Sequence, residues 1–178
     1  MIAGIVFGFV PLAIWLYLLF GRAGFWRLRE RDDFNAPRLW LAEWPSVVAL
    51  VPARDEADMI VRSLPSLLAQ NYPGRFHVIL IDDESADGTG DLARALGSGH
   101  LTVIEAAPRP PGWTGKLWAL AQGAERARAG HDPDFLWFTD ADIEHAPDSL
   151  RTLTARAKST DAVLVSLMAR LHCRSTAE

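Results

Sequence analysis

HVILIDDESADGTGDLARAL, residues 77–96, contains the pattern that decides the fold of this chain. An apolar, β-branched run at residues 77–81 leads into an acidic loop, and residues 88–96 have the composition of a helix. A short apolar run that ends at turn-forming residues predicts a buried strand. The stretch therefore predicts a strand, a polar loop and a helix in that order.

The same alternation continues on both sides of this stretch. The further strands are predicted at residues 47–51, 101–105, 135–139 and 162–167, and the further helices at residues 60–68, 116–128 and 149–157. Pro65 weighs against an unbroken helix in its segment. The residues of the helix at 116–128 that are predicted to face inward are Leu117, Leu120, Ala121 and Ala124. Strands that alternate with helices predict an α/β fold, with a mostly parallel Rossmann-type sheet and helices on both faces.

The N-terminus differs in composition from the rest of the chain, because residues 2–20 contain no charged side chain. A helix of roughly 20 apolar residues spans the ~30 Å hydrocarbon core of a bilayer. A secretory signal peptide would place positive charge before the apolar run, whereas here Arg22, Arg27 and Arg29 follow it. We therefore expect a transmembrane anchor at residues 1–21 with the following residues in the cytoplasm. A signal peptide and a buried core helix are the alternatives.

A polar connector, residues 22–45, is expected to join this anchor to a globular domain at residues 46–178. Three tryptophans mark the connector, namely Trp26, Trp40 and Trp44. Such residues suit a segment near a membrane surface, but they could equally cover the underside of the domain.

The bulk properties exclude several classes of protein. The 178 residues carry a formal net charge of -4 and show no basic stripe, so a nucleic-acid partner is not expected. Cys173 is the single cysteine, which excludes an intramolecular disulfide and a multi-cysteine zinc site. The five histidines have no metal-ligand spacing, and His145 alone lies close to an acidic pair.

Acidic and polar residues follow three of the predicted strands. They form the segments PARDE at residues 52–56, DDESADGT at residues 82–89 and DAD at residues 140–142. The carboxyl ends of parallel strands meet at one edge of a sheet, where ligands of such folds bind. Acids at these points are also common as loop residues and helix N-caps. Three such clusters in one domain favour a binding site at that edge.

The residue types indicate which chemistry this site would support. Asp140 and Asp142 would hold Mg²⁺ or Mn²⁺, which prefer carboxylate and phosphate oxygens, and strand alternation would point both side chains the same way. Such a cation neutralises the charge of a nucleotide diphosphate leaving group. Asp83 is a candidate acceptor of hydrogen bonds from a ribose or pyrimidine, and Lys116 a candidate phosphate contact.

Other nucleotide-handling classes lack their motifs in this sequence. There is neither a Walker-type loop nor a Gly-x-Gly-x-x-Gly after a strand, and Ser85 and Ser166 lack the setting of a hydrolase nucleophile. A nucleotidyltransferase that makes nucleotide sugars would need a glycine-rich loop near the first strand, where PARDEAD stands.

Four motifs in order, VPARDEA, IDDESADGT, GWTGKLWALAQGA and FTDADIEHAPDSL, resemble the inverting family 2 glycosyltransferases with a GT-A fold. More narrowly, they are similar to the bacterial glycosyltransferases associated with hopanoid biosynthesis, over about residues 47–170. The resemblance implies a domain at the bacterial inner membrane that binds a nucleotide sugar, such as a UDP-sugar, and transfers the sugar to a lipid or lipid-linked acceptor. Asp55 and Gln122 depart from the asparagines common in the family.

The resemblance also implies roles for individual residues. Those expected to border the nucleotide sugar are Pro52, Ala53, Arg54, Glu56, Asp83, Ser85, Lys116 and Asp140, and those expected at the metal are Asp140 and Asp142. The acceptor-binding half and catalytic base of the family are expected beyond Glu178, so no residue here is assigned as the base. The alternative to an active transferase is a donor-binding portion without catalysis of its own.

Overall fold

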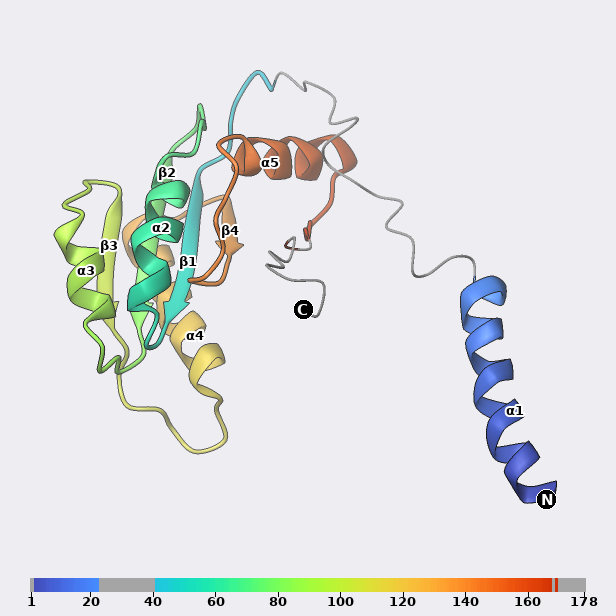
Figure 1. Cartoon of the computed structure of the whole chain (residues 1–178). Coiled ribbons are helices and arrows are strands. Elements are labelled where there is room, and N and C mark those ends of the chain that lie inside the picture. Colours follow the sequence, from blue (N-terminus) through green and yellow to red (C-terminus); the bar gives the residue numbers. More distant parts are fainter. Residues whose placement is uncertain (1, 23–40, 168, 170–178) are drawn as a thin grey trace. The chain divides into compact units, whose positions relative to one another are not determined.

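The computed structural model describes residues 2–22, 41–167 and 169 (Figure 1). The strands are β1 (Val47–Ala53), β2 (Phe76–Asp82), β3 (Leu101–Glu105) and β4 (Phe135–Phe138). The helices of the same domain are α2 (Ala57–Leu68), α3 (Thr89–Ala95), α4 (Gly115–Gly130) and α5 (Ser149–Thr160). Strand and helix alternate as the sequence predicted.

The four strands form one sheet in the order β3-β2-β1-β4, and all three neighbouring pairs are parallel. The long central strands pair Val47 with Phe76 and Ala53 with Asp82, so their ends are level. Their carboxyl ends therefore lie along one edge of the sheet, and the polar loops that follow them emerge together. This edge positions the site.

Helices pack on both faces of the sheet, as predicted (Figure 1). On one face, Val51 and Leu80 pack against Leu64 of α2, and α3 contributes the fully buried Ala93. Small residues line the other face, where α4 buries its Ala119, Gly123 and Ala127. A Cβ on Gly123 would come within 2.7 Å of the Ile81 side chain, so the glycine permits close packing of α4 on the sheet.

The helix predicted at residues 60–68 is confirmed, and α2 continues through Pro65 to Leu68. Two other predictions about these elements were wrong. Leu117 is 58% exposed, because the buried stripe of α4 is made of small residues and Leu117 does not lie on it. Within the described part of the domain, residues 162–167 form no strand, and Val163 is 99% exposed.

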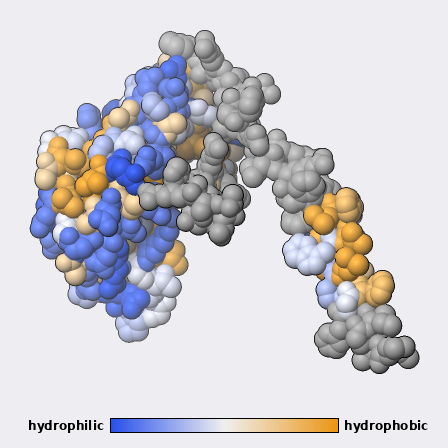
Figure 2. Space-filling model, viewed as in Figure 1, coloured by the Kyte–Doolittle hydropathy of each residue, from blue (hydrophilic) through white to orange (hydrophobic). Residues whose placement is uncertain are grey.

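The structure separates the chain into two compact units, Met1–Pro37 and Arg38–Glu178. In the first unit, α1 (Ile2–Leu16) continues into a π-helical turn, η1 (Tyr17–Gly21). Its described side chains are mostly apolar and exposed, with Phe9 at 66% and Phe20 at 80% (Figure 2). Among the described residues, no helix reaches the combination of length and hydropathy that a membrane crossing requires.

Most of the expected connector lies outside the described residues, and so do Trp26, Trp40 and Cys173. Trp44 is described, and it contacts Tyr72 edge to face with ring centroids 5.5 Å apart. The guanidinium of Arg151 lies 5.4 Å from the centre of the Trp44 ring. Trp44 therefore covers part of the domain at the amino ends of the strands.

Candidate functional site

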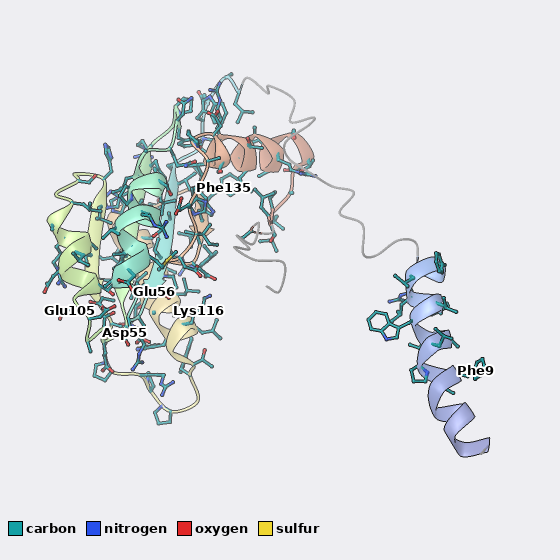
Figure 3. The ribbon with its side chains drawn as sticks, in the orientation of Figure 1. Phe9, Asp55, Glu56, Glu105, Lys116 and Phe135 are labelled. Atoms are coloured by element: carbon teal, nitrogen blue, oxygen red, sulfur yellow. The ribbon has the colours of Figure 1, made fainter. Side chains whose placement is uncertain are left out.

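A pocket of about 390 Å³ opens at the carboxyl edge of the sheet. Figure 3 shows Glu56 and Lys116 at this end of the sheet and Phe135 at the opposite end. The end of β1, the loops that follow all four strands and the start of α4 supply its walls. The lining residues are Pro52, Ala53, Arg54, Glu56, Asp83, Arg109, Gly115, Lys116, Asp140, Ala141 and Asp142.

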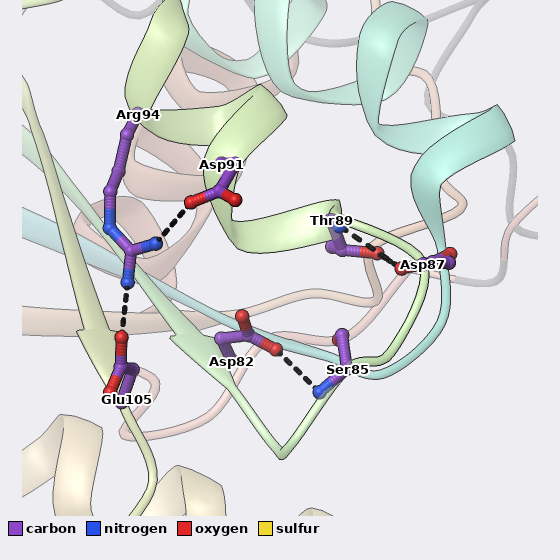
Figure 4. A network of polar contacts seen from close by, with 7 residues as sticks. All are labelled: Asp82, Ser85, Asp87, Thr89, Asp91, Arg94 and Glu105. Atoms are coloured by element: carbon purple, nitrogen blue, oxygen red, sulfur yellow. Dashed lines mark hydrogen bonds and ion pairs between the residues drawn. The ribbon is translucent and has the colours of Figure 1, made fainter.

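The loop after β2 is tied to the loop after β1 by hydrogen bonds. Asp87 Oδ2 accepts from the backbone N–H of Ala57 at 2.8 Å, and Thr89 Oγ1 accepts from that of Glu56 at 2.9 Å. Asp87 also accepts from the Thr89 hydroxyl (Figure 4). These bonds hold the pKa of the Asp87 carboxyl below its usual value. Asp87 thus fixes the position of Glu56 rather than facing the pocket itself.

Asp55 and Ser85 take part in the same set of hydrogen bonds between the loop after β1 and the loop after β2. The Asp55 N–H donates to Ser85 Oγ at 3.1 Å, and Asp55 Oδ1 accepts from the Ala86 N–H at 2.8 Å. Asp55 adopts a φ of 54°, which an aspartate tolerates better than most side chains. Ser85, predicted to border the nucleotide sugar, does not line the pocket and instead joins the two loops.

The segment Asp140-Ala141-Asp142 follows β4 after one intervening residue, Thr139. The strand ends at Phe138, so both aspartates lie in the turn beyond it, and the strand alternation assumed in the prediction does not apply to them. Ala141 is only 4% exposed and packs in the core, and its carbonyl accepts a short hydrogen bond from the Ser63 hydroxyl of α2. A buried alanine between two exposed aspartates therefore anchors the turn while leaving both carboxylates at the pocket.

Two of the cations in the pocket are paired with acids. Lys116 Nζ lies 2.6 Å from Asp140 Oδ1, and Arg54 Nη1 lies 3.7 Å from Asp83 Oδ2. Gly115 allows α4 to begin against Asp83, because a Cβ at that position would stand 2.6 Å from Asp83 Oδ2. The first turn of α4 therefore borders both the Asp83 and the Asp140 side of the pocket.

Three neighbouring carboxylates act on the ionisation of Glu56. Partial burial raises the pKa of the Glu56 carboxyl above its usual value, and the charges of Asp142, Asp87 and Asp140 raise it further. A bound cation would offset the repulsion that these neighbouring charges exert on ionised Glu56.

The residues present fit a divalent cation that is shared with a phosphorylated ligand. In the described part of the chain, no group of three or more His, Cys, Asp or Glu side chains could hold a metal ion by itself. Mg²⁺ is commonly held by one or two carboxylates while substrate phosphates and waters complete its octahedron. Asp140 and Asp142 would supply such carboxylates.

Eight of the nine residues predicted for the site line this pocket, and Ser85 does not. Three further lining residues, Arg109, Gly115 and Ala141, were not predicted, since an arginine in a proline-rich loop and a glycine or alanine at a loop position carry no specific signal. His145 does not line the pocket. Its Nε2 lies 2.9 Å from Thr139 Oγ1, its backbone N–H donates to Ser66 Oγ, and burial lowers the pKa of its imidazole. Its position points to a structural role.

A parallel sheet with helices on both faces and an acidic pocket at its carboxyl edge defines an α/β ligand-binding domain of the Rossmann type. The glycosyl transferase family 2 model matches residues 48–176. The chain therefore belongs to glycosyl transferase family 2.

Two proteins of similar sequence are also named as glycosyltransferases. The probable glycosyltransferase YdaM of Bacillus subtilis (strain 168) is 31% identical over 124 residues, which cover 65% of this chain and 29% of the relative. The 4,4'-diaponeurosporenoate glycosyltransferase of Staphylococcus haemolyticus (strain JCSC1435) is 33% identical over 99 residues, or 56% of this chain and 24% of the relative. The match thus spans between 24% and 29% of the length of these relatives.

Solved structures show the same fold. The mannosyltransferase PcManGT from Pyrobaculum calidifontis, in complex with GDP-Man and Mn²⁺, matches with a TM-score of 0.52 and 27% identity, over 65% of this chain and 33% of that one. TarS 1–349 of S. aureus in complex with UDP-GlcNAc matches with a TM-score of 0.51 and 23% identity, over 64% of this chain and 31% of that one. These neighbours are GT-A-like and bind nucleotide sugars.

Proposed function

We propose that this domain binds the nucleotide diphosphate of a sugar donor, together with Mg²⁺ or Mn²⁺, as the donor-binding part of a glycosyltransferase. The observation that carries the proposal is the convergence of Asp83, Lys116, Asp140 and Asp142 on one pocket at the carboxyl edge of the sheet. The Mn²⁺ and GDP-Man bound by the Pyrobaculum neighbour support it.

Each pocket residue would then have a defined task. Asp142 and Asp140 would hold the cation. When bound, the cation would neutralise charge on the diphosphate leaving group. Lys116 lies 2.6 Å from Asp140 and would bind a phosphate oxygen at the same place, in the first turn of α4. Asp83, whose side chain is 15% exposed, would accept hydrogen bonds from the base.

For the whole protein we propose inverting transfer of a sugar from a UDP-sugar to a lipid or lipid-linked acceptor. The resemblance to hopanoid-associated family members supports a hopanoid role, and the relatives named for 4,4'-diaponeurosporenoate support a membrane-associated acceptor. Transfer with inversion requires a base that deprotonates the acceptor hydroxyl. No side chain of this chain is assigned that role.

We further propose that residues 1–21 anchor the protein in the bacterial inner membrane, with residues 46–178 as a cytoplasmic donor-binding domain. The uncharged run at residues 2–20 and the arginines that follow it support this orientation. The exposed apolar side chains of α1, among them Phe9 and Trp15, would be covered by lipid (Figure 2).

Calorimetric titration of the full chain with UDP tests the binding proposal. We expect UDP to bind at least about tenfold more tightly with Mn²⁺ than with EDTA, and Asp142→Asn to remove that difference. Asp161→Asn is the matched control, because Asp161 follows α5 outside the pocket and should leave the metal effect unchanged. Metal-stimulated binding that survives in Asp142→Asn would refute the assignment of the site.

A second experiment separates a transferase from a donor-binding portion. Labelled UDP-sugars are supplied to the full chain together with membrane lipids, and the label in the lipid fraction is measured. Transfer of label supports catalysis by these residues, whereas metal-dependent binding without transfer supports the donor-binding alternative.

A further inference from the structure

His145 belongs to the segment that carries the two aspartates of the pocket, but it does not line the pocket itself. Its imidazole Nε2 lies 2.9 Å from the hydroxyl oxygen of Thr139, across the turn that contains Asp140 and Asp142. This hydrogen bond therefore joins the residue before the first aspartate to a residue beyond the second. The binding role proposed above does not use it.

Thr139 is the end of this contact that the sheet holds in place. The residue is 7% exposed, and its backbone N–H donates to the carbonyl of Leu50 in β1 at 3.2 Å. Without the imidazole of His145, the Thr139 hydroxyl would lose the hydrogen bond that a buried polar group requires. Because Asp140 comes next in the chain, the place of Thr139 sets where the Asp140 backbone leaves the sheet.

The imidazole of His145 is the other end of the contact, and it is supported from two more directions. Its ring packs edge to face on Trp137 of β4, with ring centroids 4.7 Å apart. Its backbone N–H donates to Ser66 Oγ of α2 at 2.9 Å, and the Ser66 hydroxyl donates to the Ser63 carbonyl at 2.6 Å. Burial lowers the pKa of the imidazole, so at pH 7 the ring is neutral and acts through its hydrogen bond rather than through charge.

The exposed fractions of residues 139 to 142 show what this frame supports. Thr139 and Ala141 are 7% and 4% exposed. Asp140 and Asp142 are exposed and line the pocket. The carbonyl of Ala141 is bound to α2, and the hydroxyl of Thr139 is bound to His145. Each aspartate therefore follows directly after a buried residue that one polar contact holds in place.

We propose that His145 is a positioning residue for the metal–diphosphate site, which holds Thr139 so that the two aspartates beyond it present their carboxylates to one divalent cation. This inference rests on the proposed function and adds a residue that touches neither the cation nor the donor. Replacing a residue that orients metal ligands typically costs about ten- to hundredfold in metal affinity, so we expect a loss of at least about tenfold here.

The test separates the affinity for the cation from the affinity for the nucleotide, in the full chain at pH 7. Free Mn²⁺ is measured by electron paramagnetic resonance with saturating UDP, against a blank of UDP alone, and UDP affinity is measured by calorimetry in EDTA. We expect His145→Phe, which keeps a ring beside Trp137 without the hydrogen bond, to weaken Mn²⁺ binding at least about tenfold and leave UDP affinity in EDTA within about twofold. His145→Gln keeps a polar group that can reach the Thr139 hydroxyl and should recover most of the loss.

A double-mutant cycle gives a second route to the same hydrogen bond. Thr139→Val removes the hydroxyl and keeps the shape of the side chain, and it should weaken Mn²⁺ binding about as much as His145→Phe. The double variant should bind Mn²⁺ within about twofold of either single variant, because both changes remove one shared contact. His100→Phe, at an exposed histidine just before β3, is the matched control and should bind Mn²⁺ as the wild type does.

The outcomes that overturn this inference differ from the one that overturns the proposed function. The inference fails on unchanged Mn²⁺ affinity in His145→Phe, on no recovery in His145→Gln, on equal losses of Mn²⁺ affinity and of UDP affinity in EDTA, or on additive losses in the double variant. If His145→Phe does not fold, unchanged Mn²⁺ affinity in Thr139→Val overturns the inference in the same way. The proposed function instead fails if Mn²⁺ has no effect on UDP binding in the wild type, and the inference then fails with it.

Discussion

Gly115 shows how one small residue shapes the pocket. Its missing side chain lets α4 begin beside Asp83, since a Cβ there would lie 2.6 Å from Asp83 Oδ2. We expect Gly115→Ala to displace Asp83 and weaken UDP binding by about tenfold in a calorimetric titration. Gly130→Ala at the other end of α4 is the matched control, because a Cβ there meets nothing within 4 Å. Equal affinities for the two variants would contradict the role of this close approach.

The ionisation of Glu56 makes the stability of the folded domain depend on pH. Burial and the neighbouring Asp142, Asp87 and Asp140 raise the pKa of its carboxyl, so folding favours the protonated form. The stability that protonated Glu56 contributes to the folded state is fully present below the usual pKa of 4.5. It is lost as the pH rises through the raised pKa of the folded protein. Ionised Glu56 therefore destabilises the metal-free domain at neutral pH.

We accordingly expect Glu56→Gln to raise the melting temperature of the metal-free protein at pH 7, with a difference that narrows towards pH 4. Thermal unfolding at several pH values measures it. Glu125→Gln makes the same change of charge on the exposed side of α4 and should show no such pH-dependent gain. A Glu56→Gln protein that is less stable than wild type at pH 7 would contradict the electrostatic account.

Single residues at the strand ends could be predicted, because a buried strand fixes where its next side chains emerge. Asp83 and Asp142 were found in this way, and Lys116 was found from its place at the start of a predicted helix; all three border the pocket. Ser85 was misplaced because its hydroxyl is used between loops, and Arg109 was missed because loop geometry decides where it points. Both depend on contacts between segments that no local pattern records.

At the scale of elements, polar side chains on α2 hold the turn that carries the two aspartates. The Ser63 hydroxyl donates to the buried carbonyl of Ala141, and Ser66 Oγ accepts from the His145 N–H at 2.9 Å. Just beyond the end of α2, the Gln70 side chain donates to the Ala146 carbonyl and accepts from the Leu150 backbone N–H. Helix α2 thus supports the metal side of the pocket from beneath.

We expect Ser63→Ala to lower the free energy of unfolding by about 1–3 kcal/mol, because it leaves a buried carbonyl without a donor. The same change should weaken Mn²⁺-dependent UDP binding, since the turn that presents Asp140 and Asp142 loses its anchor. Ser159→Ala is the control, as Ser159 is exposed at the end of α5. A loss of stability with unchanged Mn²⁺ dependence would show that Ser63 does not position the aspartates.

Helices and strands were predictable where a periodic or continuous apolar pattern is also buried. All four observed strands agree with predicted ones to within about two residues at their ends. The expected strand at residues 162–167 failed because its apolar residues pair with no strand in the described part of the domain, and Val163 and Leu164 are exposed. The prediction that Leu117 faces inward failed because the residues of α4 that pack on the sheet are small, and a search for large apolar residues overlooks them.

At the scale of the whole molecule, every lining residue of the pocket lies between Pro52 and Asp142, inside the unit Arg38–Glu178. We therefore expect removal of residues 1–37 to leave the affinity for UDP with Mn²⁺ within about twofold, while binding to lipid vesicles is lost. A full chain with Phe9→Lys and Leu16→Lys is the control, since charges in the apolar run should also abolish vesicle binding. Vesicle binding that persists without residues 1–37 would contradict the proposed anchor.

The most direct test of the central claim locates the cation itself. Crystals of the chain grown with UDP and Mn²⁺ are measured at the manganese absorption edge. The account predicts an anomalous peak about 2 Å from a carboxylate oxygen of Asp142, with the diphosphate of UDP on the opposite side of the peak and near Lys116. A manganese peak away from both Asp140 and Asp142, or UDP bound outside this pocket, would contradict it.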